Sequence, residues 1–486
     1  MSDQPLFSVE AMAQAMRAER AGALPEQIGG ISIDSRTLRT GDAFFAITGE
    51  NRDGHEFVSA ALKAGAGVAV VARDRRGLFP DSAPLLLVDD VLESLRALAR
   101  AARARSCAKI IAVTGSVGKT GTKEALRLAL SACGETHASV ASYNNHWGVP
   151  LSLARTPATA RYAVFEIGMN HAGEIAPLTR LVRPHVAIVT TVEPVHLEFF
   201  DSVEAIADAK AEIFLGIEPG GAGILNRDNP HFAQLRENAV KSGVEHIVSF
   251  GEHAAADARL ISCSLLPDCS TVRARILDAD VTYKLGAPGK HIVLNSLAAL
   301  AAVSLAGGDL ALAALALSRL EPPTGRGARM RLDLPGGSVL LIDESYNANP
   351  ASMRASLSLL GEAQIGRRGR RIAVLGDMLE LGPRGEAFHR DLAEAVRGNR
   401  VDLVFCCGPL MRALWEALPS GRRGGYAESS QALEPQLLAA VRAGDAVMVK
   451  GSLGSRMGLL VRALQRHFTP SPSALADQLS ATAPVP

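Results

Sequence analysis

The chain of 486 residues is 48% hydrophobic, 21% charged and 4% aromatic, and its formal net charge is +1. This composition excludes a disordered chain, because disordered chains carry more charge and fewer apolar residues. The near-zero net charge gives no electrostatic reason to bind nucleic acid or an anionic membrane, so we expect neither partner. At roughly 150 residues per domain, the length predicts about three globular units.

Two further features of the sequence indicate where the protein works. Its six cysteines are too few for a disulfide scaffold and lack the paired CxxC spacing of a structural zinc site. The N-terminus carries acidic residues early and no apolar core, unlike a signal peptide, and no apolar stretch is long enough to predict a membrane span. We therefore expect a cytoplasmic protein without stable membrane association, and we expect it to be a monomer.

Apolar, strand-like runs alternate with helical patterns along nearly the whole chain. This alternation predicts an α/β fold with mainly parallel sheets. Several runs end in a polar residue beside a turn. Ligands bind at this position in open parallel sheets, although polar turn residues also end strands without any such role. The strand-end residues are Thr114, Glu166, Thr191, Asn226, Asp343, Asp377 and Lys450.

Shifts in composition predict the domain boundaries. An apolar run at 85–90 leads into an Arg/Ala-rich helix at 91–105, and residues 321–325 have the Pro/Gly composition of a linker. The last residues are rich in Pro, Ser and Ala, which predicts a disordered tail. The predicted units are an N-terminal domain at 1–89, a central domain at 90–323, a C-terminal domain at 324–468 and the tail at 469–486.

Residues 110–123, IIAVTGSVGKTGTK, have the pattern of a buried strand, a glycine loop and the start of a helix. Backbone N–H groups at the positive end of such a helix can cradle phosphate oxygens. The lysine would reach the β- and γ-phosphates of a nucleotide, and the threonine after it would bind Mg²⁺. We favour nucleotide binding over an ordinary strand-to-helix turn, through Thr114, Gly115, Ser116, Val117, Gly118, Lys119 and Thr120.

Three further side chains are candidates for this site. Glu166 ends an apolar strand and could hold the same Mg²⁺ as the threonine of the loop. His196 follows the next strand, either as a ligand or as an ordinary hydrogen-bonded loop histidine. Lys210 belongs to a predicted helix at 202–214, on whose apolar face lie Val203, Ile206, Ala207, Lys210, Ile213 and Phe214.

A lysine on an apolar face is costly unless its charge is compensated or removed. Lys210 could extend its ammonium to solvent or pair with an acid such as Glu166. Alternatively, its neutral amine could react with CO₂ to give a carbamate, an anionic group whose oxygens can bind a metal. The sequence leaves both interpretations open.

The motifs TGSVGKT and AKAEIF, together with Glu166 and His196, resemble the central domain of the Mur ligases. These are ATP-dependent, amide-forming enzymes of peptidoglycan precursor synthesis, and the resemblance covers nearly the whole chain. It implies a small N-terminal α/β domain, a central P-loop domain with a parallel sheet, and a Rossmann-like C-terminal α/β domain. It also implies that Lys210 is carbamylated and that two Mg²⁺ ions are held by Thr120, Glu166, His196 and Lys210.

Other motifs extend the resemblance to the nucleotide. PGKHIVLNSLAALAA at 288–302 is similar to the family's adenine-side helix, which implicates His291 and Asn295. GRGARMRL places Arg326 at the family's phosphate-contacting arginine. Asp343 and Lys450 would then orient the nucleotide or the reaction intermediate.

The first domain resembles the family's uridine-diphosphate-binding domain. The segment ISIDSRT contains Asp34, Ser35 and Arg36, and the segment SYNNHWGVP brings Asn144 and Asn145 towards the UDP-sugar. The guanidinium of Arg36 suits a phosphate, although a surface salt bridge would account for this arginine equally well.

LIDESYNANPASM and VLGDMLELG look like the branch of the family that adds D-alanyl-D-alanine, and they implicate Asn347, Asn349 and Pro350 in dipeptide binding. The resemblance implies an ATP-dependent ligase that joins D-Ala-D-Ala to UDP-MurNAc-tripeptide through an acyl phosphate. Two alternatives remain. One is a sibling amide ligase that forms the tripeptide or polyglutamylates folate, and the other is a non-catalytic nucleotide-binding module.

Overall fold

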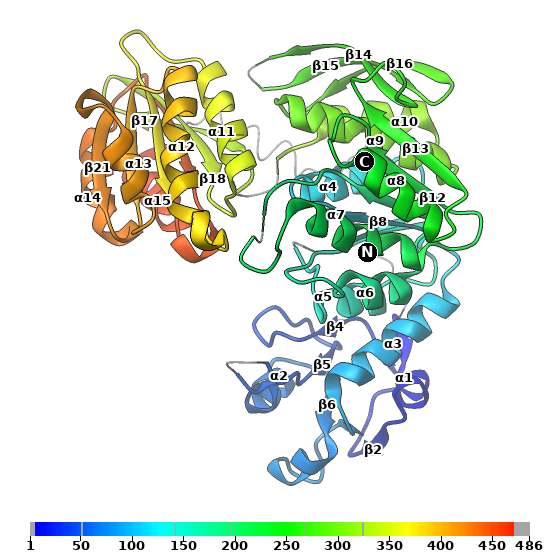
Figure 1. Ribbon diagram of the computed structural model, residues 1–486. Helices are drawn as coiled ribbons and strands as arrows, with labels where there is room; N and C mark the ends of the chain where they lie inside the picture. Colours follow the sequence, from blue (N-terminus) through cyan, green and yellow to red (C-terminus); the bar gives the residue numbers. More distant parts are fainter. Residues whose placement is uncertain are drawn as a thin grey trace.

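The computed structural model describes residues 5–49, 52–140, 142–195, 197–266, 268–322 and 325–470. In Figure 1 the chain forms three blocks that follow one another along the sequence, each built on its own main β-sheet. The predicted α/β class is confirmed. His196 and the predicted tail from residue 471 onwards lie outside the described residues.

The first block is built on a small sheet. Its strands are β1 (Phe7–Ser8), β2 (Glu19–Ala21), β3 (Gln27–Ile28), β4 (Ile31–Ser32), β5 (Ala43–Phe45), β6 (Val68–Ala72) and β7 (Leu85–Val88), and its helices are α1 (Val9–Met16), α2 (Val58–Lys63) and α3 (Val91–Arg105). The main sheet has the order β2-β7-β6-β5-β4, in which only β2 is antiparallel to its neighbour. β1 and β3 form a separate antiparallel pair.

The central block is built on a nine-stranded sheet. Its strands are β8 (Lys109–Thr114), β9 (Thr136–Ala138), β10 (Tyr162–Glu166), β11 (Val186–Val189), β12 (Ala222–Asn226), β13 (His246–Gly251), β14 (Ala258–Leu265), β15 (Ser270–Ile276) and β16 (Ala279–Leu285). The order is β16-β15-β14-β13-β12-β11-β8-β10-β9. Neighbours from β9 to β14 are parallel, and the β14–β15–β16 edge is antiparallel.

Helices cover both faces of this sheet, which explains why its strands are continuous apolar runs. They are α4 (Lys119–Ser131), α5 (Gly148–Ala154), α6 (Ile175–Val182), α7 (Val203–Ala211), α8 (Phe232–Lys241), α9 (Lys290–Leu305) and α10 (Leu310–Ala316). In β8, Ile110 and Ala112 belong to the core that includes α5 and α6. Ile111 and Val113 point to the opposite core, which includes α4 and α9. The phosphate loop therefore starts from a strand that is buried on both sides.

The helix predicted at 202–214 is shorter than expected. α7 begins after Ser202, whose hydroxyl accepts the Ala205 N–H, and it ends at Ala211. The chain continues as a 3₁₀ turn at Glu212–Gly216. Ile213 and Phe214 stay buried in the same core as the helix, so the apolar stripe continues although the helical geometry changes.

The third block is built on a seven-stranded sheet with the order β21-β20-β19-β22-β18-β17-β23. The strands are β17 (Ala328–Leu334), β18 (Gly337–Glu344), β19 (Arg371–Gly376), β20 (Leu403–Cys407), β21 (Arg423–Ala427), β22 (Ala446–Lys450) and β23 (Thr469–Pro470). β18 to β22 are parallel, and β17 and β23 are antiparallel additions. The helices are α11 (Pro350–Glu362), α12 (Gly385–Gly398), α13 (Arg412–Ala417), α14 (Ser430–Ala440) and α15 (Gly458–His467).

The helices of the third block divide between the two faces of its sheet. Leu357 of α11, Leu392 of α12 and Leu414 of α13 share one core. Leu437 of α14 and Leu460 of α15 share the other. The chain therefore leaves β19 and β20 towards one face, and β21 and β22 towards the other. Connections that diverge in this way open a crevice at the carboxyl ends of parallel strands.

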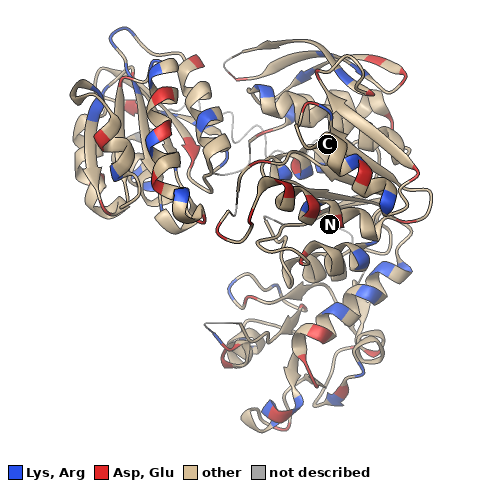
Figure 2. Cartoon of the chain, viewed as in Figure 1, with Lys and Arg blue, Asp and Glu red and all other residues tan. Residues whose placement is uncertain are grey.

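Charged residues of both signs are mixed over the surface. Figure 2 shows Lys and Arg interspersed with Asp and Glu over all three blocks, in agreement with the net charge of +1. Within the described ranges, no helix combines the length and the apolar character needed to cross a membrane.

Arg103 ties α3 to the central block. Its side chain is almost fully buried. Its Nε donates to the Val182 carbonyl at 2.9 Å, and its Nη2 donates to the Arg183 carbonyl and the Glu218 carboxylate, each at 2.9 Å. These bonds hold the end of α3 against the end of α6.

We expect Arg103→Met to destabilise the protein by about 2–4 kcal/mol, because it removes the donor to the Val182 and Arg183 carbonyls and leaves Glu218 with Arg183 as its ion-pair partner. Urea and thermal unfolding measure this loss. The control is Arg96→Met on the exposed side of α3, which removes only a 3.4 Å contact with Glu93 and should change stability by less than about 0.5 kcal/mol. Equal effects of the two substitutions would contradict this role of Arg103.

Candidate active site

The phosphate loop connects β8 to α4 and needs two of its glycines. Gly118 precedes the helix with φ +88°, and a Cβ there would lie 2.5 Å from Nδ2 of Asn295. Gly115 has φ +148°, and its Cβ would lie 1.9 Å from Oγ1 of Thr190. Both positions thus combine a left-handed φ with a close approach of another side chain, which only glycine tolerates. Asn295, which the resemblance implicates in nucleotide binding, lies beside the loop.

Residues that follow the neighbouring strand β11 hold the phosphate loop in shape. The Ser116 hydroxyl donates to the Glu193 carbonyl at 3.1 Å and accepts from the Glu193 N–H at 2.9 Å. Thr190 Oγ1 donates to the Val117 carbonyl at 2.6 Å. Lys119 Nζ donates to the Gly115 carbonyl at 2.6 Å, so its ammonium lies over the loop. Thr190 and Glu193 were missed by the sequence analysis, because no local pattern relates them to a loop more than seventy residues earlier.

The Thr120 hydroxyl and the Glu166 carboxylate meet at the end of the loop. Thr120 Oγ1 donates to Glu166 Oε2 at 2.8 Å, and Asn144 Nδ2 donates to Glu166 Oε1 at 2.7 Å. Ser142 Oγ lies 3.5 Å from Thr120 Oγ1. Glu166 is 1% exposed and Thr120 is 4% exposed. The structure therefore brings Thr120 and Glu166, the two residues predicted to share a Mg²⁺, together in a buried position.

The donor chemistry of this pair fits a hard cation. Mg²⁺ prefers oxygen ligands and is usually held by one or two carboxylates together with phosphates and water. Thr120 and Glu166 provide a hydroxyl and a carboxylate next to a phosphate loop. Across the described part of the chain, no cluster of three or more His, Cys, Asp or Glu side chains could hold a metal ion. A cation at Thr120 and Glu166 would therefore also need ligands from phosphate or water.

Lys210 is buried in the same region. Its side chain is 2% exposed on α7, and among the described residues we find no hydrogen bond or ion pair to its ammonium. Among the described contacts, the predicted alternative of a Lys210–Glu166 pair is not seen, and Thr120 and Asn144 donate to the two oxygens of Glu166. Burial, and secondarily the charge of Lys119, lowers the pKa of Lys210 well below its ordinary value. The neutral amine is thereby favoured.

The third block contributes Arg326 to the same site. The Arg326 guanidinium lies 4.4 Å from the ring centroid of Tyr346, and its Nη2 lies 3.4 Å from Oγ of Ser142. Burial lowers the pKa of Lys119, the carboxylate of Glu166 opposes this shift, and Arg326 adds to it. Lys119 and Arg326 therefore provide two positive charges to one region, as a phosphate chain requires.

The other residues predicted for the nucleotide lie around this region. His291 is exposed in the first turn of α9. Asp343 is the next-to-last residue of β18 and is buried, and its Oδ1 accepts from the backbone N–H and the hydroxyl of Ser345. Lys450 Nζ donates to Glu344 Oε2 and to the Asn347 carbonyl, both at 3.1 Å. Lys450 is therefore bonded within its own block.

The residues predicted for the UDP-sugar lie in two groups. Arg36 donates to both carboxylate oxygens of Asp34 at 2.9 and 2.7 Å, and its side chain is 82% exposed. Hydrogen bonding from Arg36 lowers the pKa of Asp34. Ser35 between them is half-buried. Asn145 Oδ1 accepts the Gly148 N–H at the start of α5, whereas Asn144 turns to Glu166.

The residues predicted for the dipeptide have local structural roles. Asn349 caps α11 in a capping box with Ser352, and Pro350 is the first residue of the helix. Both are buried, whereas Asn347 is exposed. None of the three lines the crevice of the third block.

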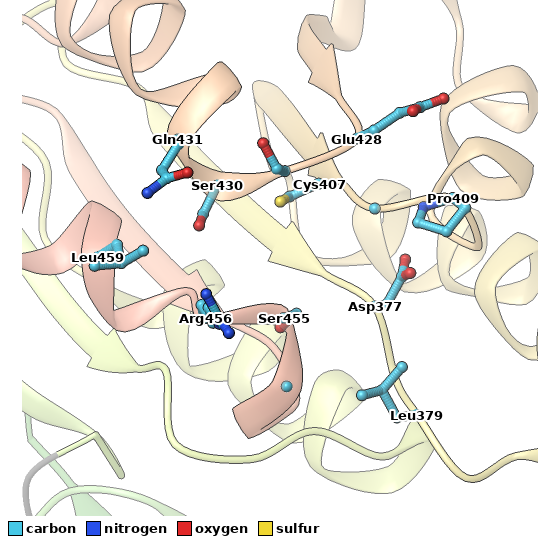
Figure 3. A pocket seen from close by; sticks show the side chains of 13 residues that line it. Asp377, Leu379, Cys407, Pro409, Glu428, Ser430, Gln431, Ser455, Arg456 and Leu459 are labelled. Carbon is cyan, nitrogen blue, oxygen red and sulfur yellow. The ribbon is translucent and has the colours of Figure 1, made fainter.

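That crevice is a cavity of about 340 Å³ at the carboxyl ends of β19, β20, β21 and β22. Figure 3 shows Arg456 and Leu459 on one side, Asp377 and Leu379 on another, and Cys407 between them. Asp377 is one of the predicted strand-end residues, whereas the sequence does not indicate the crevice. The only available signal was the order of the strands, which the sequence does not contain.

Asp377 holds the crevice together. Its Oδ1 accepts the Met411 N–H at 2.8 Å and its Oδ2 accepts the Leu410 N–H at 3.3 Å. A Cβ on Gly408, which has φ +109°, would lie 2.4 Å from Cγ of Asp377. Burial raises the pKa of Asp377, and the two backbone N–H groups oppose that shift. The carboxylate thus fixes the loop after β20.

Family models match successive parts of the chain. They are the catalytic domain of the Mur ligase family over residues 27–103, the Mur ligase middle domain over 113–303 and the Mur ligase glutamate ligase domain over 329–453. Similar proteins include the UDP-N-acetylmuramoyl-tripeptide--D-alanyl-D-alanine ligase of Escherichia coli strain K12, 34% identical over 91% of this chain and 95% of the relative. That of Bacillus subtilis strain 168 is 32% identical over 94% and 98%.

Solved structures agree with these similarities. MurF from Acinetobacter baumannii has a TM-score of 0.80 at 30% identity, covering 95% of this chain and 99% of that one. MurF from Thermotoga maritima, solved in complex with ADP, has a TM-score of 0.73 at 27% identity, covering 90% and 97%.

We expect Gly118→Ala to weaken ATP binding at least about tenfold, because a Cβ at φ +88° is strained and would strike Asn295. Isothermal titration calorimetry measures the affinity. The control is Gly121→Ala in the same helix, where a Cβ meets nothing within 4 Å, so affinity should stay unchanged. Wild-type affinity in Gly118→Ala would argue against this loop as the nucleotide site.

Proposed function

We propose that this chain, which belongs to the Mur ligase family, uses ATP to join D-alanyl-D-alanine to UDP-N-acetylmuramoyl-tripeptide. The observation that carries the proposal is the buried Thr120–Glu166 pair at the end of the phosphate loop. The relatives from Escherichia coli and Bacillus subtilis are named for this reaction.

The reaction needs activation because an amide does not form spontaneously from a carboxylate and an amine in water. Transfer of the γ-phosphoryl group of ATP to the tripeptide carboxylate gives an acyl phosphate and ADP. Attack by the neutral amine of D-Ala-D-Ala then forms the amide and releases phosphate and a proton. Lys119, Arg326 and the loop N–H groups would offset the repulsion between the phosphates and the carboxylate.

Magnesium fits the site through the oxygen donors already described. When bound, Mg²⁺ would neutralise part of the negative charge of the phosphates. We propose that Thr120 and Glu166 hold one ion. We propose His196 and carbamylated Lys210 for a second ion.

The carbamate proposal rests on the environment of Lys210. A neutral amine adds to CO₂ and releases one proton, which turns a buried cation into an anion. The burial of Lys210, its lowered pKa and the lack of a carboxylate partner among the described residues all favour the neutral amine that this step needs. A nearby Mg²⁺ would then stabilise the anion.

Separate sets of residues would bind the nucleotide and the UDP-sugar. We propose His291, Asn295 and Asp343 for the nucleotide. For the UDP-sugar we propose the motif residues Asp34, Ser35 and Arg36, together with Asn144 and Asn145. Arg36 would have to exchange its bonds to Asp34 for a phosphate, or bind the phosphate with its remaining N–H donors.

For the dipeptide we propose the crevice of the third block. Asn349 caps α11 and Pro350 is the first residue of that helix. Because both have these structural roles, we favour the crevice as the dipeptide site. Arg456 is exposed in the crevice, and within the described chain its guanidinium has no ion pair, so it can receive the dipeptide carboxylate. Leu379 and Leu459 provide apolar surface for small methyl side chains.

We expect phosphate release from ATP only when UDP-MurNAc-tripeptide and D-Ala-D-Ala are both present. The assay couples phosphate detection to mass spectrometry of the product. The product mass should equal that of the two substrates minus one water. Tripeptides with lysine or meso-diaminopimelate at the third position are both tested.

Other outcomes of this assay identify the alternatives. Release with a single amino acid, and none with D-Ala-D-Ala, would indicate a sibling amide ligase. ATP binding without release for every substrate combination would indicate a non-catalytic module.

We expect Lys210→Ala to lower kcat by at least about a thousandfold, since it removes the carbamate and with it a metal ligand. Formate, acetate or bicarbonate at high concentration should partly restore activity, because a free anion can occupy the vacated space. The control is Lys241→Ala, which removes an exposed lysine paired with Glu237 and should leave kcat unchanged. Full activity of Lys210→Ala without added anion would contradict the carbamate.

A further inference from the structure

We infer that His389 is a positioning residue for the dipeptide, because it holds the turn Asp377–Gly382 in the shape that forms one wall of the crevice. This inference rests on the proposed function. The turn follows β19, and Leu379 from it faces the crevice in Figure 3. His389 itself lies on α12 and does not line the crevice.

The two ring nitrogens of His389 have opposite roles. Nδ1 lies 2.6 Å from the Gly385 carbonyl, and Nε2 lies 2.9 Å from the Met378 N. A carbonyl can only accept and an N–H can only donate, so Nδ1 must carry the proton and Nε2 must accept. His389 is fully buried, and burial lowers its pKa, which preserves this neutral form.

The same turn is bound to two neighbouring loops. The Leu379 N–H donates to the Ser452 hydroxyl at 3.0 Å, and the Ser452 N–H donates to the Asp377 carbonyl at 3.0 Å. The Asp377 N–H donates to the Cys407 carbonyl at 3.1 Å. The N–H of Met378, between Asp377 and Leu379, donates to His389, so the histidine anchors the middle of this segment.

The other side of the turn meets the central block. The Glu380 carbonyl accepts the Glu198 N–H at 3.4 Å, and Glu380 itself has φ +61°. Leu197 packs against both the central core and the core that contains Met378 and Leu381. A non-glycine residue at positive φ is strained and must be held by its surroundings. The turn therefore joins the crevice to the central loop that follows β11.

The loss of the His389 anchor should consequently affect the dipeptide and not the nucleotide. With Met378 released, Leu379 and the contact with Leu197 lose their fixed positions. The amine would then bind less tightly and attack from a less defined position. The phosphate loop is bonded to Thr190 and Glu193, and neither of these bonds involves His389 or Met378, so we expect nucleotide binding to be unaffected.

The test compares two substitutions. His389→Leu keeps the apolar volume and removes both hydrogen bonds, so we expect the KM for D-Ala-D-Ala to rise about tenfold while the Kd for ATP stays within about twofold. In His389→Gln, Oε1 can replace Nε2 as the acceptor for Met378, so most of the wild-type KM should return.

A matched control removes the same kind of bond elsewhere. His185 Nδ1 accepts the Ile110 N–H at 3.0 Å at the amino ends of the central strands. His185→Leu should lower the Tm and leave the KM for D-Ala-D-Ala unchanged. Should His389→Leu not fold, His389→Asn, too short to reach Met378, replaces it in the comparison with His389→Gln.

Hydrogen exchange of residues 377–382 provides a readout independent of activity. We expect faster exchange in His389→Leu than in wild type and near-wild-type exchange in His389→Gln. Unchanged exchange and unchanged KM in a folded His389→Leu protein would overturn the inference. A wild-type protein that releases no phosphate with D-Ala-D-Ala would instead contradict the proposed function, and the exchange data would still test the anchor.

Discussion

The hydrogen bond from the Thr120 hydroxyl to the Glu166 carboxylate joins the phosphate loop to the neighbouring strand at the centre of the candidate active site. Glu166 pairs with Val113 of the neighbouring parallel strand, so the phosphate loop and the carboxylate leave the sheet at the same edge. A buried carboxylate is tolerated when its oxygens are bonded, and Thr120 and Asn144 bond both of them. The same burial strengthens the attraction between this carboxylate and a cation.

Lys210 presents the opposite problem at the same place. Its amine is buried near the positive charge of Lys119, so the protonated form is disfavoured both by burial and by repulsion. Carbamylation would reverse the sign of the charge and add oxygen donors that suit Mg²⁺. The positive charge of Lys119, which disfavours an ammonium, would favour the proposed anion, whereas burial disfavours either charge unless a cation compensates it.

The third block contains a second candidate binding region, the crevice at the carboxyl ends of its strands. Its helices leave β19 and β20 towards one face and β21 and β22 towards the other, which opens the crevice where Arg456 lies. The turn at Asp377–Gly382 borders this crevice and also contacts the central block through Glu198. One short segment, anchored by His389, thereby connects the proposed dipeptide site to the loop of the proposed metal site.

Features that follow from local geometry can be read in the sequence. Short segments of the sequence show the α/β alternation, the position of Gly118 in the phosphate loop and the place of Lys210 on an apolar helix face. They do so because backbone conformation and helical periodicity are local properties. Other features depend on contacts between distant parts of the chain. In the structure, Asn349 caps the start of α11. Helix α7 ends at Ala211, earlier than the sequence predicts. The crevice and the bond between His389 and Met378 depend on which strands become neighbours, and that is set by the packing of the whole block.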